Sequence, residues 1–167
     1  FPEAHSASFA LLCYVSSWLK CHHPAAFYCA LLNSLPMGFY SASQLVQDAQ
    51  RHGIRVLPLD VQNSTWENRL EIKFEGSQNL SGFRLGLCRI KGLSKEVGMR
   101  VEQARIDRPY ASTEELARRA KLSKADLERL ASADALNSIA GHRYQARWQA
   151  SGVEPERPLL NNDSQLN

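Results

Sequence analysis

The stretch RLGLCRIKGLSKEVGMRVEQAR, from Arg84 to Arg105, carries most of what can be inferred about this chain. It begins as an apolar, strand-like run, breaks at Lys91-Gly92-Leu93, and restarts as an amphipathic helix. Gly92 permits a tight turn and a close approach of the main chain to a ligand, and Ser94 can cap the helix that follows. The sequence therefore predicts a sharp turn that leads directly into a helix.

The predicted turn is suited to bind an anion. A helix N-terminus carries partial positive charge and unpaired amide groups, and Lys91 and Lys95 add full charges beside it. Such a turn resembles the hairpin of the helix-hairpin-helix motif, although Ser94 replaces the second of its two usual glycines. A plain loop between strand and helix is the alternative. The predicted DNA-binding groups of this turn are Lys91, Gly92, Leu93, Ser94 and Lys95.

Composition and charge narrow the class of protein. The chain has 167 residues and is 44% hydrophobic, which is typical of one sizeable globular domain or two small ones. The net charge is +3, but it is unevenly distributed. Residues 84–105 contain six basic and two acidic residues, whereas residues 1–50 contain one basic and two acidic residues. This concentration favours a polyanionic partner, and a solvated helix face is the alternative.

Cysteine spacing and hydropathy indicate a cytoplasmic protein. The cysteines, at positions 13, 21, 29 and 88, lack the close spacing of a zinc site, so buried, reduced thiols are predicted. No apolar run approaches the length of a membrane span, and the N-terminus has no signal-peptide layout. Because Phe1 is not a start methionine, we expect a piece of a longer chain.

Helical patterns dominate the first third of the chain. Apolar residues cover much of the circumference of the predicted helix Ala4–Leu19, so this helix is expected to be buried. A second helix is predicted over Ala25–Leu35. A third covers Ser41–His52, with a capping serine at its start and Gly53 as its stop.

The pattern then changes to short extended runs. Ile54–Val61 and Arg69–Phe74 are predicted strands, Glu75–Ser81 is a turn-rich connection, and Gly82–Ile90 supplies the next strand. The sequence therefore predicts a small antiparallel sheet. Together with the flanking helices, this gives a mainly α fold with a small antiparallel β element.

A second helix–break–helix pattern follows the stretch described first. Ser112 and Ser123 each stand three residues before an acidic residue and are predicted to open two helices with capping boxes. The chain breaks again at residues 133–136, and His142 and Arg143 precede a last helix to Ala150. Residues 151–167 are predicted to be a mobile tail.

Two stretches resemble a known enzyme family. FPEAHSASFALLCYVSSWLKCHHPAAFYCALLNS, residues 1–34, is similar to the end of the fingers region in the alpha subunit of bacterial DNA polymerase III, a C-family DNA polymerase. PMGFYSASQLVQDAQRHGIRVLPLDV, residues 36–61, resembles its error-prone, damage-inducible branch. In that family a tandem helix-hairpin-helix domain follows.

The resemblance divides the chain into four parts. It implies a fingers end at residues 1–52, a β-containing connection at 53–83, a tandem helix-hairpin-helix DNA-binding domain at 84–150, and the tail at 151–167. Such a piece of an error-prone DNA polymerase would hold primer–template duplex through non-specific phosphate contacts, and so serve translesion synthesis.

Catalysis is expected elsewhere in such a polymerase. The family transfers nucleotides with two Mg²⁺ ions held by carboxylates of the palm, which precedes this region. This sequence has no close Asp-x-Asp arrangement, so we predict no catalytic residue, metal ligand or cofactor here, and no activity of the chain alone. The fingers contacts that the resemblance implies are His5, Ser6 and Lys20. The alternative is that His5 and Ser6 cap the first helix and Lys20 faces solvent.

The second predicted hairpin departs from the family pattern. Asp134 stands where a glycine commonly precedes the apolar residue of the turn, and a carboxylate there would repel phosphate. His142 and Arg143 are the candidate DNA contacts of this unit, and a packing role is the alternative. The competing function is a protein-interaction module that docks polymerase accessory subunits without touching DNA. No membrane partner is predicted, and no Lys and Asp constellation supports a free-standing nuclease or glycosylase.

Overall fold

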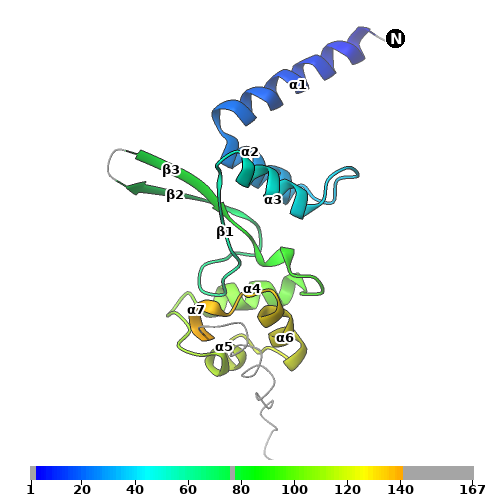
Figure 1. The fold of residues 1–167 in the computed structure, drawn as a ribbon. Helices are drawn as coiled ribbons and strands as arrows, with labels where there is room; N and C mark the ends of the chain where they lie inside the picture. The colour runs from blue at the N-terminus through cyan, green and yellow to red at the C-terminus, as the bar shows by residue number, and fades with distance from the viewer. Residues whose placement is uncertain (1–2, 76–77, 141–167) are drawn as a thin grey trace, which may run out of the picture.

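The computed structural model describes residues 3–75 and 78–140, with α1 at one end of the molecule, a sheet in the middle and α4–α7 at the other end (Figure 1). The helices are α1 (Glu3–His22), α2 (Pro24–Asn33), α3 (Ala42–Arg51), α4 (Lys95–Ala104), α5 (Thr113–Arg119), α6 (Lys124–Ser132) and α7 (Asn137–Ala140). The strands are β1 (Arg55–Leu57), β2 (Arg69–Glu75) and β3 (Gln78–Arg84), and a 3-10 helix, η1, covers Leu87–Arg89. The expected mainly α fold with a small β element is confirmed.

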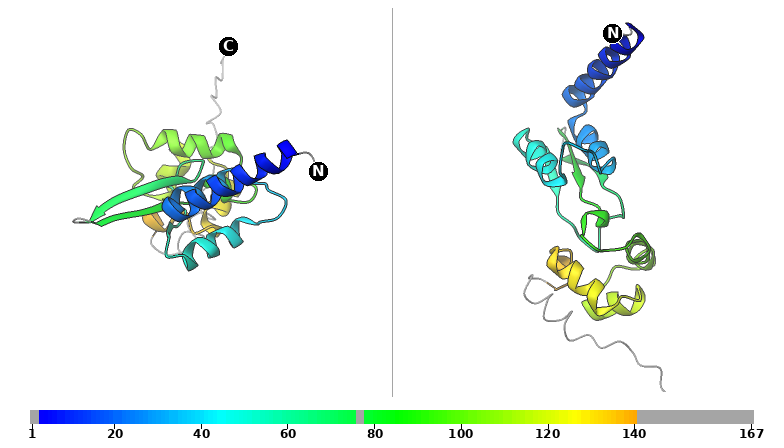
Figure 2. Two further views of the ribbon diagram at one scale, coloured as in Figure 1. Left: turned by 90° about the horizontal axis from the view of Figure 1, so that it is seen from above. Right: turned by 90° about the vertical axis from the view of Figure 1, so that its right-hand side faces the viewer.

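Helix α1 is exposed, so the prediction that it is buried is wrong. It extends away from the other elements and meets them near its C-terminal end, where it packs against α2 (Figure 2). Its apolar pattern indicates burial, but one neighbouring helix cannot cover a helix that is apolar around most of its circumference. The exposed apolar side chains, 38% to 69% accessible, are Phe9, Leu11, Leu12, Tyr14, Val15, Trp18 and Leu19.

The prediction of buried cysteines is also wrong for α1. Cys13 and Cys21 are exposed because the helix that carries them is exposed. Cys29 of α2 is buried, and this burial raises the pKa of its thiol. Cys88 is half-buried.

Helices α2 and α3 pack on the sheet and form one apolar core. Ser41 caps α3 as predicted, since its side chain accepts from the amide of Gln44 while the Gln44 side chain accepts from the amide of Ser41. Gly53, with φ of +75°, follows α3 in the left-handed conformation expected after a helix. The buried residues of this core are Tyr28, Cys29, Leu32, Leu45, Ala49 and Phe83.

The sheet is mixed, with strand order β1-β3-β2. β2 and β3 form an antiparallel hairpin, as predicted, but β1 pairs with β3 in parallel. The chain reverses after β1 and again after β2, and β3 enters between the two earlier strands. Two reversals of direction bring β3 beside β1, so these two strands run in the same direction.

The predicted strand Gly82–Ile90 is wrong over most of its length. β3 begins at Gln78, inside the segment predicted to be a turn-rich connection, and ends at Arg84. The amides of Leu87 and Cys88 then donate to the carbonyl groups of residues 65 and 66, and the 3-10 helix η1 forms at residues 87–89. Because these amides are already bonded to the segment before β2, they are not available to continue β3 as a longer strand.

Helices α4 to α7 surround a second core, to which the segment 58–68 is bound. Val61 is completely buried in this core, and Arg105, the residue after α4, donates to the Val61 carbonyl at 2.7 Å. Ser64 donates to the Leu85 carbonyl at 2.7 Å, and the amide of Trp66 donates to Glu102 at 3.0 Å. These contacts fix the sheet to the helices at the C-terminal side.

Asn68 ties this segment to the helices at the N-terminal side. Its side chain and its amide both donate to the Asn33 side chain at the end of α2, at 2.6 and 2.9 Å. Its own side-chain oxygen accepts from the amide of Gly86 at 3.0 Å. The two cores are therefore joined by buried hydrogen bonds as well as by the chain itself.

Candidate nucleic-acid interface

The first hairpin is the turn between η1 and α4, residues 90–94. Gly92 has a φ of +80°, which L-residues rarely adopt, and the amide of Leu93 donates to the Ile90 carbonyl at 3.2 Å to close the turn. Ile90 and Leu93 are both buried, at 6% and 7% accessible, and anchor the turn in the second core. This anchoring holds Lys91 and Gly92 at the surface.

The hairpin presents backbone donors to solvent. Ser94 caps α4 as predicted, because its side chain accepts from the amide of Val97 at 3.3 Å. Over residues 3–75 and 78–140, no acceptor is found for the amides of Gly92, Ser94, Lys95 and Glu96. Each of these four residues is exposed. An anion placed there would receive several N–H groups at the positive end of α4.

Leu93 differs from the other predicted contacts of this turn. Its amide is already bonded and its side chain lies in the core. Leu93 therefore anchors the turn. The other predicted contacts are all exposed: Lys91, Gly92, Ser94 and Lys95.

Three of the six basic residues in the stretch 84–105 bind carboxylates or backbone carbonyl groups. Arg84 is paired with Glu71, and Arg105 donates to the Val61 carbonyl. Arg100 donates to Glu96 at 2.9 Å and to the Ala120 carbonyl at 3.0 Å. Since Arg100 neutralises Glu96, the one carboxylate in the first turn of α4 is compensated.

The two lysines of the hairpin carry the available charge. Lys91 and Lys95 are exposed, and neither forms an ion pair within the part of the chain that the structure describes. In sequence they lie on either side of the cap residue Ser94. The site therefore combines fixed backbone donors with two mobile cations, which suits an exposed phosphate.

The second hairpin, between α6 and α7, forms hydrogen bonds with the segment 58–68. Asp134 adopts the left-handed conformation, with φ of +57°, that a glycine would adopt more easily. The Ala135 carbonyl accepts from the amide of Val61 at 2.9 Å, and Ser138 donates to the carboxylate of Asp60 at 2.5 Å. A carboxylate of the chain thus lies beside the first turn of α7. The predicted contacts His142 and Arg143, and the last helix to Ala150, lie outside the described residues.

The predicted fingers contacts lie on α1, far along the chain from the hairpins. His5 and Ser6 are inside this helix, since it already includes Glu3, and the His5 ring contacts the Phe9 ring. Lys20 lies 3.5 Å from the carboxylate of Asp48 on α3. The structure brings none of the three to the first hairpin (Figure 1).

Sequence reasoning missed one cation beside the first hairpin. Arg129 of α6 lies so close that a Cβ added to Gly92 would be 3.1 Å from its Nε atom. Arg129 also donates to Asp126 at 2.9 Å. A separation of 37 positions leaves no local signal for this contact, because only the folding of α6 against the turn creates it.

The described residues do not fit a two-metal site. No three His, Cys, Asp or Glu side chains come together in them. The adjacent carboxylates Glu114 and Glu115 begin α5, where Glu115 accepts from the amide of Ala111 at 2.8 Å and pairs with Arg108 and Arg119. The Ala111 amide first, and then the two arginines, hold the pKa of the Glu115 carboxyl below its ordinary value.

A turn with positive φ leads into a helix twice, at Gly92 before α4 and at Asp134 before α7, and this arrangement defines a helix-hairpin-helix protein. A family profile described as helix-hairpin-helix motif matches residues 53–146, and the chain belongs to this family. No helix of the described residues is long and apolar enough to cross a membrane.

Comparison with characterised proteins identifies the kind of larger protein that contains such a segment. The chain is 58% identical over 163 residues to the error-prone DNA polymerase of Teredinibacter turnerae, and 57% identical over 164 residues to that of Saccharophagus degradans. It is 49% identical over 174 residues to that of Methylococcus capsulatus. These matches cover 95% to 98% of this chain but only 16% to 17% of the relatives. The chain is thus homologous to one segment of error-prone DNA polymerases, and the resemblance seen in its sequence is confirmed.

Proposed function

We propose that this chain holds primer–template duplex by its sugar–phosphate backbone within an error-prone DNA polymerase that carries out translesion synthesis. The observation that carries the proposal is the set of free amides at Gly92, Ser94, Lys95 and Glu96 beside the unpaired Lys91. The homology to error-prone DNA polymerases supports DNA as the ligand.

The proposed contacts position the duplex and read no bases. Backbone amides and lysines recognise phosphate oxygens, which are the same at every nucleotide. Each phosphate contact releases counterions, so log Kobs should fall with log[salt] with a slope of about −0.9 for each contact on duplex DNA. Binding should therefore be salt-dependent and nearly independent of sequence.

We further propose that nucleotidyl transfer takes place in a part of the polymerase to which this segment does not correspond. The relatives are about six times as long as the matched region, because the chain spans 16% to 17% of them. The palm of such a polymerase would hold Mg²⁺, and this segment would be inactive alone. Accessory proteins would recruit the complete enzyme, which would act in the cytoplasm.

The exposed apolar surface of α1 favours a second candidate function. Trp18, Leu12 and Phe9 are 44% to 60% accessible, and surfaces of this kind are usually covered by protein. The second hairpin, bonded to Asp60 and Val61, also has a packing role. A module that docks a polymerase subunit without touching DNA would use these features and would leave the first hairpin free.

Salt-dependent binding of the 167-residue chain to a labelled primer–template duplex separates the two functions. Fluorescence anisotropy should show affinity that falls steeply with NaCl and is lost in Lys91→Glu. Arg51→Glu makes the same change of charge on the exposed end of α3, which lies on the α1 side of the sheet and away from α4 (Figure 1), and should bind nearly as wild type. Absence of duplex binding at low salt, while a polymerase subunit still docks, would reject the DNA function.

A further inference from the structure

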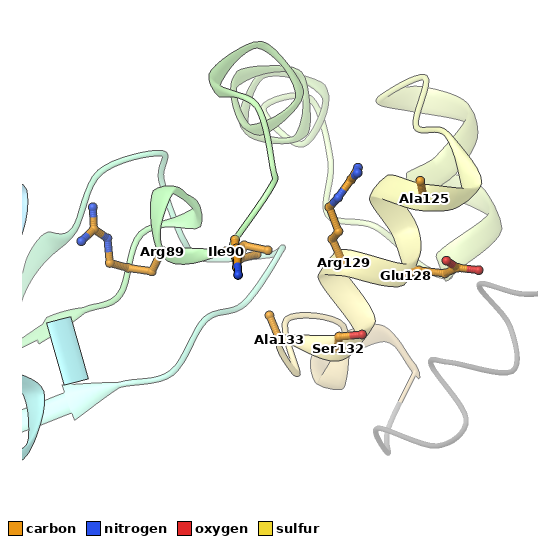
Figure 3. A pocket seen from close by; sticks show the side chains of 8 residues that line it. Arg89, Ile90, Ala125, Glu128, Arg129, Ser132 and Ala133 are labelled. Carbon is orange, nitrogen blue, oxygen red and sulfur yellow. The ribbon is translucent and has the colours of Figure 1, made fainter. Parts of the chain in front are cut away.

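A hollow of about 640 Å³ lies between the first hairpin and α6. Its apolar lining residues are Ile90 of the hairpin, Ala125 of α6 and Ala133 just after α6, and Arg129 stands beside Ile90 (Figure 3). The volume falls within the range of about 300–1,000 Å³ that is common for small-ligand sites. Apolar side chains beside cations match the chemistry of deoxyribose and phosphate.

The charges around the hollow are positive in excess. Arg89, Lys91 and Arg129 line it together with one carboxylate, Glu128. Arg129 is 41% exposed and donates one Nη atom to Asp126, which leaves its other nitrogen donors available. Arg89 donates through its Nε to the sulfur of Cys88 at 3.3 Å, and its side chain extends away from α6 (Figure 3).

Arg129 connects the hollow to the site on α4. Its Nε lies 3.1 Å from the position of a Cβ on Gly92, so its guanidinium reaches the turn that presents the free amides. Lys91 borders both the hollow and these amides. Along one strand of duplex DNA, a charge follows about every 3.4 Å of helix axis, so a phosphate held on α4 has neighbours close beside it.

We propose that this hollow is a second backbone subsite, in which Arg129 binds the phosphate adjacent to the one on α4 and the apolar side chains of the hollow contact the sugar. This proposal rests on the proposed function, and it names the DNA backbone as the ligand of the surface next to the α4 site. DNA is favoured over an acidic peptide because the hollow adjoins the free amides. A strand that places one phosphate on these amides can place its next phosphate in the hollow.

Salt dependence of duplex binding tests the subsite in the 167-residue chain. Arg129→Gln should reduce the slope of log Kobs against log[salt] by about 0.9. Arg129→Lys keeps the charge and should restore most of the slope. Arg51→Gln removes an equal charge from α3, away from the hairpin, and should leave the slope unchanged. Circular dichroism of each variant verifies that the fold is retained.

A matched pair of substitutions tests the hollow without removing any native group. Ala125 lines the hollow and is exposed, so larger side chains fit there without disturbing the core. Ala125→Glu places a carboxylate in the hollow and should weaken duplex binding at low salt, whereas Ala125→Gln, of nearly equal size, should weaken it much less.

The outcomes distinguish the subsite from the proposed function. Should Lys95→Gln lower the slope while Arg129→Gln and Ala125→Glu leave duplex binding unchanged, the subsite does not exist and the hairpin still binds DNA. Should the wild-type chain show no salt-dependent binding at all, both proposals fail. If the hollow binds an acidic peptide instead of DNA, the first of these results is expected.

Discussion

Replacing Gly92 with alanine should separate the shape of the first hairpin from its charge. Gly92 has φ of +80°, and an L-residue in this left-handed region costs about 1–2 kcal/mol. The new Cβ would also lie 3.1 Å from Nε of Arg129, which must move by a few tenths of an ångström. We expect the free amides of the turn to shift, and duplex affinity to fall at least about tenfold if even one charge-assisted hydrogen bond of about 1.5–3 kcal/mol is lost.

Gly53→Ala is the matched control for this substitution. Gly53 has φ of +75° and no atom within 4 Å of its Cβ position, and it follows α3, far from the hairpin. Both variants should lose similar stability, measured as about 2–4 °C in Tm for each kcal/mol in a chain of this size. Only Gly92→Ala should lose affinity in duplex anisotropy. Equal duplex affinities in the two variants would refute the claim that the geometry of the turn matters.

Two further predictions concern the groups that hold the fold together. Asn68→Ala should lower the free energy of unfolding by about 1–3 kcal/mol in urea denaturation, because the buried amide of Gly86 loses its acceptor; a loss near zero would contradict the proposed joint between the cores. The Tyr28 hydroxyl donates to Asp48 at 2.5 Å and holds the pKa of that carboxyl below its ordinary value. The stabilisation is therefore complete above about pH 4, the ordinary Asp pKa, and is lost as the pH falls through the lower, folded-state pKa. In melts from pH 7 to pH 2, the Tm difference between wild type and Asp48→Asn should shrink at the acid end, and a constant difference would reject this assignment.

Local rules predicted the parts of the fold that local chemistry determines. Ser41, Ser94 and Ser123 cap helices as expected, because capping needs only residues within one turn. Gly53 and Gly92 occupy the left-handed conformation for the same reason. These features fixed the position of the first hairpin before any tertiary contact was known.

The errors arose where burial or pairing depends on distant residues. The apolar pattern of α1 was interpreted as burial, but periodicity describes only the helix and not what covers it. Residues 85–90 are as apolar as a strand, yet the amide of Leu87 finds its acceptor in the segment before β2 and the strand ends at Arg84. Pairing of this kind cannot be derived from alternation alone.

The candidate site was predictable in part for the same reason. Lys91 and Lys95 lie within the motif itself and could be found from its sequence. Charge counts could not show that Arg100 and Arg105 are engaged in structural contacts, since their partners are carbonyl groups brought close by folding. Arg129 was missed because it reaches Gly92 only when α6 packs against the turn.

Amide chemical shifts measured during a titration with duplex DNA test the central claim most directly. In ¹H–¹⁵N correlation spectra of the 18.7 kDa chain, we predict that the resonances of Gly92, Ser94, Lys95 and Glu96 move with added duplex and return at high salt. The amide of Ala135, which is bonded to the Leu130 carbonyl in the second hairpin, should stay in place. Movement of Ala135 alone, or no movement of the four amides at saturating duplex, would contradict the account.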